Sequence, residues 1–336
     1  MTQNKTILLT GIAGFIGYHT ASRLVRDGFR VIGIDNLNDY YSPQLKIDRL
    51  AQLGIQYHEG IQRFEKEQIV FYYGDLQDSG LLDEIYRKED CGGIISLAAQ
   101  AGVRYSIDNP QAYVDSNITG FLNILELAKK YRPQHVVYAS SSSIYGLNAK
   151  QPFSETDPCN TPISVYAASK KANESMAEVY AHLYHLKLTG LRFFTVYGPW
   201  GRPDMAPMLF AKAAYNNEQI KIFNYGNQSR DFTYIDDIVE GIVRVYSADS
   251  LNGSTIFNIG NGHPVNLLAF VETLENASGI TIDKQFVEAQ PGDVTETYAD
   301  ISKLAKQIDF TPQVGIKEGI QIFNEWYKDY FGNPNK

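Results

Sequence analysis

The stretch that decides the fold is Thr10-Gly11-Ile12-Ala13-Gly14-Phe15-Ile16-Gly17. It follows an apolar run at residues 6–10, which predicts a strand, and it opens an amphipathic pattern at residues 15–27, which predicts a helix. Glycines at such a junction allow a tight turn, close packing of helix on strand, and the approach of backbone N–H groups to a phosphate. A glycine turn that binds nothing could share this spacing, so the segments around it decide between the two interpretations.

The segments that follow repeat the alternation of strand and helix. Near-continuous apolar strands separated by helices indicate a parallel sheet covered on both faces, so we predict an α/β fold with a doubly wound (Rossmann) sheet. After about Gly198 prolines and glycines interrupt the chain and the elements become shorter, which predicts a smaller C-terminal lobe. We expect domains at residues 1–198 and 199–336, with some of the later chain, such as 256–259, returning to the sheet. The further strands are predicted at residues 30–34, 69–73, 93–97, 135–139 and 187–193.

A carboxylate, Asp35, closes the second predicted strand, 18 residues after Gly17. There it can accept hydrogen bonds from the two ribose hydroxyls of an adenine dinucleotide and would repel a 2′-phosphate, so NAD is favoured over NADP. Gly11, Gly14 and Gly17 would hold the pyrophosphate. For Asp75 a helix N-cap before residues 78–89 explains the residue equally well. The other expected cofactor contacts are Phe15, Ile16, Asn36, Asn38, Asp75, Leu76, Leu97, Ala98 and Ala99.

A phenol and an ammonium group, Tyr166 and Lys170, lie four residues apart in a helix predicted at 164–185, hence on one face. A nearby cation stabilises a phenolate and lowers its pKa, which makes a tyrosine useful as a base. The pair alone is common on helix surfaces. Upstream, Ser140-Ser141-Ser142-Ser143 follows the strand at 135–139, at the edge where open α/β sheets bind ligands. A hydroxyl there can bond the reacting oxygen and relay its proton to Tyr166.

These motifs resemble the extended short-chain dehydrogenase/reductase (NAD-dependent epimerase/dehydratase) family, from Thr6 to about Asp300. Within the family the chain is most similar to the UDP-glucuronate 4-epimerases. Three segments carry that similarity: Asp35-Asn36-Leu37-Asn38-Asp39-Tyr40-Tyr41, Leu97-Ala98-Ala99-Gln100-Ala101-Gly102-Val103-Arg104-Tyr105-Ser106, and Arg192-Phe193-Phe194-Thr195-Val196-Tyr197-Gly198-Pro199-Trp200-Gly201-Arg202-Pro203-Asp204-Met205-Ala206.

The resemblance implies that Ser141, Tyr166 and Lys170 are catalytic, with Ser142 and Ser143 assisting, and that Tyr166 and Lys170 also contact NAD. It further implies substrate contacts in the later part of the chain. Thr195 and Arg230 would bind the UDP diphosphate, and Asp293 would bind the UDP ribose or close the pocket. Galactose-type epimerases often have asparagine at the Thr195 position and arginine at the Gln290 position, so these departures weaken a neutral-hexose assignment.

Two further arginines are substrate candidates. A guanidinium in the loop after residues 187–193, Arg202, could hold a planar carboxylate bidentately. It could equally bond backbone or the diphosphate. For Arg104 the same two alternatives remain: it contacts the substrate, or it forms a structural ion pair.

The reaction so implied is NAD-dependent C4 epimerisation of a UDP-uronic acid, UDP-glucuronate to UDP-galacturonate, through a 4-keto intermediate. A 4-epimerase of UDP-glucose or UDP-N-acetylglucosamine is the alternative. Related dehydratases carry Thr-Asp-Glu at positions 141–143, and Ser142 and Ser143 are neither acid nor base, which disfavours dehydration. A non-catalytic nucleotide-sugar or NAD sensor would be signalled by loss of Tyr166 or Lys170, and both are present.

Composition narrows the remaining classes. The 336 residues are 44% hydrophobic and 20% charged, with net charge −8 and no block of like charge, which disfavours nucleic-acid binding. Two cysteines, Cys91 and Cys159, without a CxxC pair or histidine cluster, favour neither disulfides nor a metal site. With no signal-peptide pattern and no membrane-length apolar run, we expect a soluble cytoplasmic protein. The resemblance also implies a homodimer through helices at 113–130 and 164–185.

Overall fold

The computed structural model describes residues 4–148, 150–289 and 295–332. The chain divides into two compact units, one built from Met1–Asn148, Glu155–Phe193 and Val239–Phe257, the other from Ala149–Ser154, Phe194–Ile238 and Asn258–Lys336.

An eight-stranded sheet in the order β11-β7-β6-β5-β1-β2-β4-β3 forms the centre of the first unit. Parallel pairing joins β1 to β2 and β5, β2 to β4, β5 to β6, and β6 to β7, whereas β3 pairs with β4 in the antiparallel sense. Residues 256–259 lie in β11. The strands are β1 (Thr6–Thr10), β2 (Arg30–Asp35), β3 (Arg63–Lys66), β4 (Ile69–Tyr73), β5 (Gly93–Ser96), β6 (Val136–Ser141), β7 (Leu188–Phe193) and β11 (Ser254–Ile259).

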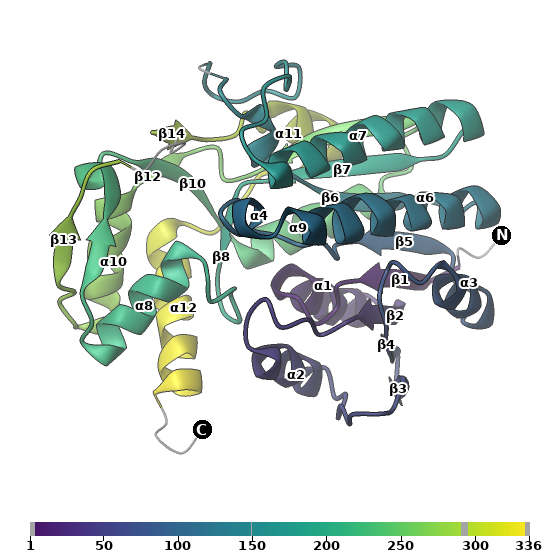
Figure 1. The fold of residues 1–336 in the computed structure, drawn as a ribbon, viewed down its shortest axis with the longest axis horizontal. Coiled ribbons are helices and arrows are strands. Elements are labelled where there is room, and N and C mark those ends of the chain that lie inside the picture. The colour runs from purple at the N-terminus through teal and green to yellow at the C-terminus, as the bar shows by residue number, and fades with distance from the viewer. Residues whose placement is uncertain (1–3, 149, 290–294, 333–336) are drawn as a thin grey trace. The chain divides into compact units, whose positions relative to one another are not determined.

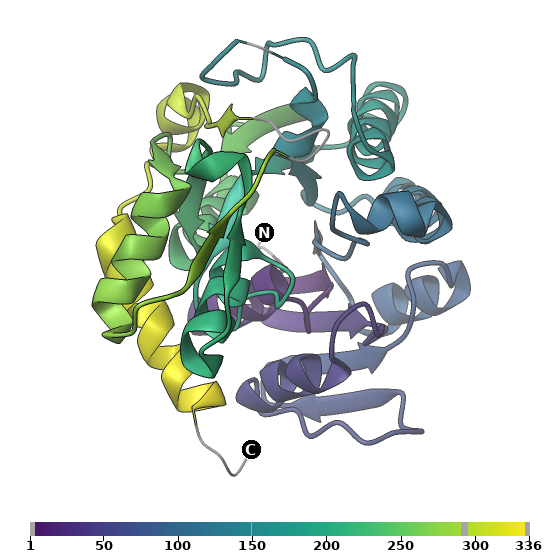
Figure 2. The ribbon, with the colours of Figure 1, turned by 60° about the vertical axis from the view of Figure 1, so that its left-hand side comes forward.

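The helices of this unit lie on both faces of the sheet. From β1 the chain steps to β2 on one side, and after β4 it crosses back to β5 on the other. Right-handed crossovers then place α1 and α2 on one face and α3, α6 and α7 on the opposite face. Both views show α3, α6 and α7 in a row beside the sheet (Figure 1 and Figure 2). The helices are α1 (Phe15–Arg26), α2 (Pro43–Gln52), α3 (Ser79–Lys88), α4 (Tyr105–Asp108), α5 (Pro110–Tyr113), α6 (Gly120–Tyr131) and α7 (Val165–Tyr184), with a π-helix η1 (Val114–Thr119) and a 3-10 turn η2 (Ser142–Tyr145). The predicted doubly wound fold is confirmed.

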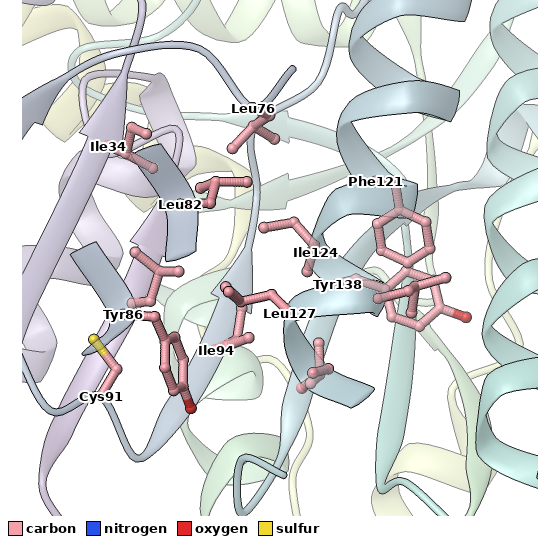
Figure 3. Packing of buried hydrophobic residues seen from close by; sticks show 14 of the residues in the cluster. Ile34, Leu76, Leu82, Tyr86, Cys91, Ile94, Phe121, Ile124, Leu127 and Tyr138 are labelled. Atoms are coloured by element: carbon pink, nitrogen blue, oxygen red, sulfur yellow. The ribbon is translucent and has the colours of Figure 1, made fainter. Parts of the chain in front are cut away.

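Apolar side chains at strand and helix periods fill the space between the sheet and α3, α6 and α7. Ile34 and Ile94 come from strands, Tyr86 from α3, and Phe121 and Ile124 from α6 (Figure 3). Burying each such side chain contributes roughly 1.5–3 kcal/mol, so this layer fixes the strands whose carboxyl ends carry the candidate site.

The second unit contains two small sheets. A four-stranded one joins β12, β10 and β14, with β8 also pairing β10, and β13 pairs with β9. Aromatic packing forms its core, for example Phe232 against Phe270 with ring centroids 4.4 Å apart. The elements are β8 (Thr195–Tyr197), β9 (Ile220–Ile222), β10 (Ser229–Tyr234), β12 (Pro264–Asn266), β13 (Lys284–Phe286), β14 (Glu296–Thr297), α8 (Ala206–Asn216), the 3-10 turn η3 (Phe223–Gly226), α10 (Leu267–Ser278), α11 (Ser302–Ile308) and α12 (Ile316–Phe331); α9 (Ile235–Ser247) begins here and continues in the first unit.

Candidate active site

The glycine turn between β1 and α1 is closed so tightly that side chains do not fit. Gly11 has φ +74°, and its carbonyl accepts from the N–H of Gly14 at 2.9 Å. A Cβ added at Gly17 would lie 1.9 Å from the Gly11 oxygen, and one at Gly11 would lie 2.8 Å from the nitrogen of Ala98. Gly14 caps α1 without a side-chain hydrogen bond. The turn is therefore bare backbone at a helix N-terminus, which suits a pyrophosphate.

The Asp35 carboxylate is held against this turn. Its Oδ2 accepts from the N–H of Ala13 at 3.1 Å and its Oδ1 from the N–H of Leu37 at 2.9 Å. Each carboxylate oxygen has a second lone pair, so both can still accept from ribose hydroxyls. Burial raises the pKa of Asp35, and the charge of Lys46 opposes this. The glycine turn and the two Asp35 carboxylate oxygens together fit a dinucleotide that lacks a 2′-phosphate.

The other predicted cofactor residues flank the same strand ends. Asn36 donates from Nδ2 to Asp75 Oδ2 at 2.7 Å, which joins the ends of β2 and β4. After β5, the N–H of Leu97 donates to the Thr10 carbonyl at 3.2 Å, and that of Ala98 to the Thr10 hydroxyl at 3.0 Å. Ala99 follows them, half-buried, as is Ile16, whereas Phe15 is buried in the first turn of α1.

Two of the predicted cofactor residues, Leu76 and Asp75, make contacts within the protein that the sequence did not reveal. Leu76 is buried in the apolar layer of Figure 3. The N-cap of α3 is Asp78, whose Oδ1 accepts from the N–H of Leu81, and not Asp75. Asp75 instead accepts from Asn36 and from the N–H of Gln77, so the capping explanation for Asp75 is wrong.

Sequence reasoning missed two buried cations beside this cofactor site. On α2, Lys46 donates to the Asn38 carbonyl at 2.6 Å and to its Oδ1 at 2.8 Å, and Arg49 donates to the Ala13 carbonyl at 3.0 Å. Lys46 is 5% exposed and Arg49 fully buried. They fix the loop after β2 and the glycine turn. Their signal was only a pair of basic residues three apart within an apolar helix pattern.

The serine segment lies where β6 ends and η2 begins. Ser141 Oγ accepts from the N–H of Ser143 at 3.2 Å and from its hydroxyl at 2.9 Å. Ser141 is buried, and Ser142 and Ser143 are half-buried. The hydroxyls of Ser141 and Ser143 thus form a connected pair at the carboxyl end of a central strand.

Tyr166 and Lys170 lie on α7, which packs against both β6 and η2. Ser164 caps this helix by accepting from the N–H of Ala167 at 3.0 Å. The Lys170 ammonium donates to the Ala139 carbonyl of β6 at 2.9 Å. Lys170 is 3% exposed, and burial lowers its pKa to about 8. A desolvated ammonium one turn from a phenol favours the phenolate.

A second feature that the sequence did not reveal is the π-helix η1. Asn117 within it accepts from the N–H of Gln100 at 2.8 Å and donates to the Gln100 carbonyl at 3.0 Å and to Ser169 Oγ at 2.9 Å. Ser169 in turn donates to the Tyr166 carbonyl at 2.8 Å. The chain after β5 and the first turns of α7 are thereby tied together. A buried asparagine in an apolar helix pattern was the only available signal.

The predicted substrate residues are distributed over both units. Arg104, in the first unit, is exposed at the start of α4. In the second unit, Thr195 begins β8, and Arg230 on β10 donates from Nη1 to the carbonyls of Ser229 at 2.9 Å and Thr295 at 3.2 Å. Asp293 lies outside the described residues.

Arg202 engages a carboxylate within its own loop. Its Nε donates to Asp204 Oδ1 at 3.1 Å and its Nη2 to Oδ2 at 2.5 Å, with 23% and 30% of the two side chains exposed. This is the bidentate geometry expected for an arginine that recognises a planar anion.

Among residues 4–148, 150–289 and 295–332 no helix is long and apolar enough to cross a membrane. Within the same part of the chain, histidine, cysteine and acidic side chains nowhere gather in a group of three or more that could hold a metal ion.

Comparison with known proteins places these features in context. A model of the NAD dependent epimerase/dehydratase family matches residues 7–260. Protein CapI of Staphylococcus aureus is 48% identical over 97% of this chain and 99% of its own length. UDP-glucuronate 4-epimerase 4 of Arabidopsis thaliana is 44% identical over 98% of this chain and 77% of its own. The crystal structure of UDP-glucuronic acid 4-epimerase from Bacillus cereus, in complex with UDP-glucuronic acid and NAD, is 31% identical; the match covers 96% of this chain and 99% of that one, with a TM-score of 0.86.

Proposed function

The chain belongs to the NAD dependent epimerase/dehydratase family, and we propose that it interconverts UDP-glucuronate and UDP-galacturonate at C4. It is an isomerase that uses NAD, and it acts on a nucleotide sugar. The uronic acid as substrate is supported by the similarity to UDP-glucuronate 4-epimerases. It is also supported by one observation in the structure, the bidentate hold of Arg202 on a carboxylate.

Tyr166 is the proposed acid and base. Its phenolate accepts the proton of the sugar 4-hydroxyl, and the phenol returns a proton to O4 after the 4-keto sugar has turned over in the site. The buried Lys170 ammonium, held on the Ala139 carbonyl at 2.9 Å, stabilises that phenolate. Bound NAD would supply reversible hydride transfer at C4, with return to the opposite face of the turned sugar, so the reaction has no net redox change. Ser141, bonded to the Ser143 hydroxyl, would donate to the sugar O4 and relay the proton.

Arg202 has a second task in this proposal. A glucuronate oxidised at C4 is a β-keto acid, and it loses CO₂ when the C5–C6 bond aligns with the carbonyl π system. An epimerase must hold the carboxylate so that this bond stays near the carbonyl plane. The Nε and Nη2 groups of Arg202, which donate to the two carboxylate oxygens of Asp204, could hold a substrate carboxylate in the same planar geometry. Asp204 would then give way to the substrate.

The proposal is tested by a product assay. Purified protein is incubated with UDP-glucuronate, UDP-glucose and UDP-N-acetylglucosamine in parallel, and the products are separated and identified by NMR. We expect the C4 epimer of UDP-glucuronate as the main product. Epimerisation of a neutral UDP-sugar with none of UDP-glucuronate would overturn the uronic-acid assignment and leave the 4-epimerase class intact.

We also propose that the chain forms a homodimer through α6 and α7. Apolar side chains stand exposed on these helices, namely Leu122 at 39%, Val179 at 52% and Leu183 at 59%. Analytical ultracentrifugation of wild type and of Leu183→Glu tests this. Ile61→Glu is the control, because Ile61 is also an exposed apolar residue but lies outside α6 and α7. A monomeric wild type, or a dimer that survives Leu183→Glu and Val179→Glu together, contradicts the proposal.

A further inference from the structure

A buried ion pair lies next to the serine segment and outside the groups that the proposed mechanism uses. Arg192 of β7 donates from Nε and Nη2 to the two carboxylate oxygens of Glu174 on α7, each at 2.9 Å. Only 4% and 5% of these side chains are exposed. Removing two charges from water costs several kcal/mol per ion, and an apolar pair of similar volume is often at least as stable. Stability alone is thus a weak reason for this pair.

Each member of the pair also holds the chain near one end of the serine segment. The Ser140 hydroxyl donates to Glu174 Oε1 at 2.6 Å. Two residues beyond the segment, at the end of η2, Arg192 donates from Nη1 to the Tyr145 hydroxyl at 2.9 Å, and its guanidinium lies over the Tyr145 ring, 4.9 Å from the centroid. The residues between these two attachment points are Ser141, Ser142, Ser143 and Ile144. One ion pair therefore fixes the chain on both sides of these residues.

The same helix carries the proposed acid–base residues. Tyr166, Lys170 and Glu174 are spaced by four residues on α7, so they follow one another along a single face. Lys170 bonds the carbonyl of Ala139, the residue before Ser140. The contacts from Lys170 and Glu174 thus run from one face of α7 to consecutive residues of β6.

We propose that Glu174 and Arg192 are positioning residues, which hold the Ser141 and Ser143 hydroxyls in register with Tyr166 for proton transfer. The inference rests on the proposed function, since it assigns these hydroxyls to the reacting oxygen. Neither Glu174 nor Arg192 needs to touch the sugar. A displacement of about 1 Å in a catalytic group can cost on the order of 100-fold in rate, so a loosened segment lowers kcat while binding is kept.

The experiment removes the attachments one at a time and leaves the buried charges paired. Ser140→Ala deletes the hydroxyl bonded to Glu174, and Tyr145→Phe deletes the one bonded to Arg192. Thr189→Val is the matched control, because Thr189 is also buried on β7 and bonds a buried partner, His135 Nε2, at 2.8 Å, but near the strand's other end. For each variant one measures kcat, KM and Tm. One also measures the rate at which NADH forms when UDP-sugar is added, from the rise in absorbance at 340 nm.

We expect kcat and the 340 nm rate to fall about tenfold in Ser140→Ala and in Tyr145→Phe, and further in the double variant, with KM within about twofold of wild type. Thr189→Val should lose Tm and keep kcat. The inference is overturned if the two variants lose only Tm, as the control does, or if kcat falls equally in all three. A wild type that epimerises no UDP-sugar would instead refute the proposed function, so the two failures are distinguishable.

Discussion

Lys170→Met tests how the buried ammonium acts on the candidate base. Methionine has a similar length and keeps the buried space filled, but it removes the charge and the hydrogen bond to the Ala139 carbonyl at 2.9 Å. If the two charges are about 6 Å apart, as are Cβ atoms one helical turn apart, and the effective dielectric is about 20, an ammonium stabilises a phenolate by about 3 kcal/mol. That corresponds to about 2 pKa units. Loss of the cation should therefore raise the pKa of Tyr166 by about that amount.

The assay is the rate of UDP-sugar epimerisation between pH 6 and pH 10. At pH 7 we expect a rate about 100-fold below wild type, because the phenolate is that much scarcer. The difference should narrow above pH 8, since the pKa of Lys170 is about 8 and the wild-type ammonium loses its charge there. Lys171→Met, one residue along and only half-buried, is the control and should follow the wild-type curve. A Lys170→Met variant whose pH profile keeps the wild-type shape would refute the electrostatic role.

Stability separates this effect from misfolding. The folded pKa of Lys170 is about 8 and its ordinary value is 10.5, so unfolding takes up a proton between these pH values. Burial of the ammonium thus costs the folded state about 3 kcal/mol at pH 7, and this cost disappears as the pH rises to 10.5. Lys170→Met should be at least as stable as wild type at pH 7, with an advantage that shrinks between pH 8 and pH 10.5.

Three other substitutions address the remaining roles. Asp35→Asn should narrow the preference for NAD over NADP, measured by titration of cofactor-free protein; equal affinity of wild type for both cofactors would remove Asp35 from this role. Tyr166→Phe should lower kcat by about 10²–10⁴ with UDP-sugar binding largely intact, and near-normal turnover would refute Tyr166 as acid and base. Arg202→Lys should slow epimerisation of UDP-glucuronate at least tenfold, about 1.4 kcal/mol, and release CO₂, because lysine keeps the charge and loses the fork; an equal loss on neutral sugars without CO₂ would reassign Arg202 to the diphosphate.

The sheet was predictable because each of its parallel strands is an apolar run that adjoins a segment with the apolar spacing of a helix. Residues 6–10 and 69–73 coincide with β1 and β4, and 164–185 with α7 and its two capping residues. The helix expected at 113–130 is instead divided into α5, the π-helix η1 and α6. Apolar spacing alone does not distinguish a π turn from an α turn, so the role of Asn117 stayed hidden.

The parts of the site that the sequence missed depend on contacts between distant residues. Asp78 directly precedes α3 and caps it, whereas the Asp75 carboxylate accepts from Asn36, which lies 39 residues earlier in the chain. Lys46 and Arg49 are read as surface charges until α2 is packed against the turn. Similarly, Arg192 and Glu174 appear as ordinary charged residues in a strand and a helix, and only the packing of α7 on β6 and β7 reveals them as a pair.

The most direct test of the proposed reaction uses UDP-glucuronate that carries deuterium at C4. After incubation with purified protein and no added reductant, the UDP-uronic acids are separated and analysed by NMR and mass spectrometry. Hydride transfer and return predict UDP-galacturonate with deuterium retained at C4 and absent from the solvent. UDP-galacturonate that has lost the label to water would contradict the account. So would UDP-glucuronate recovered unchanged from a protein preparation that epimerises a neutral UDP-sugar.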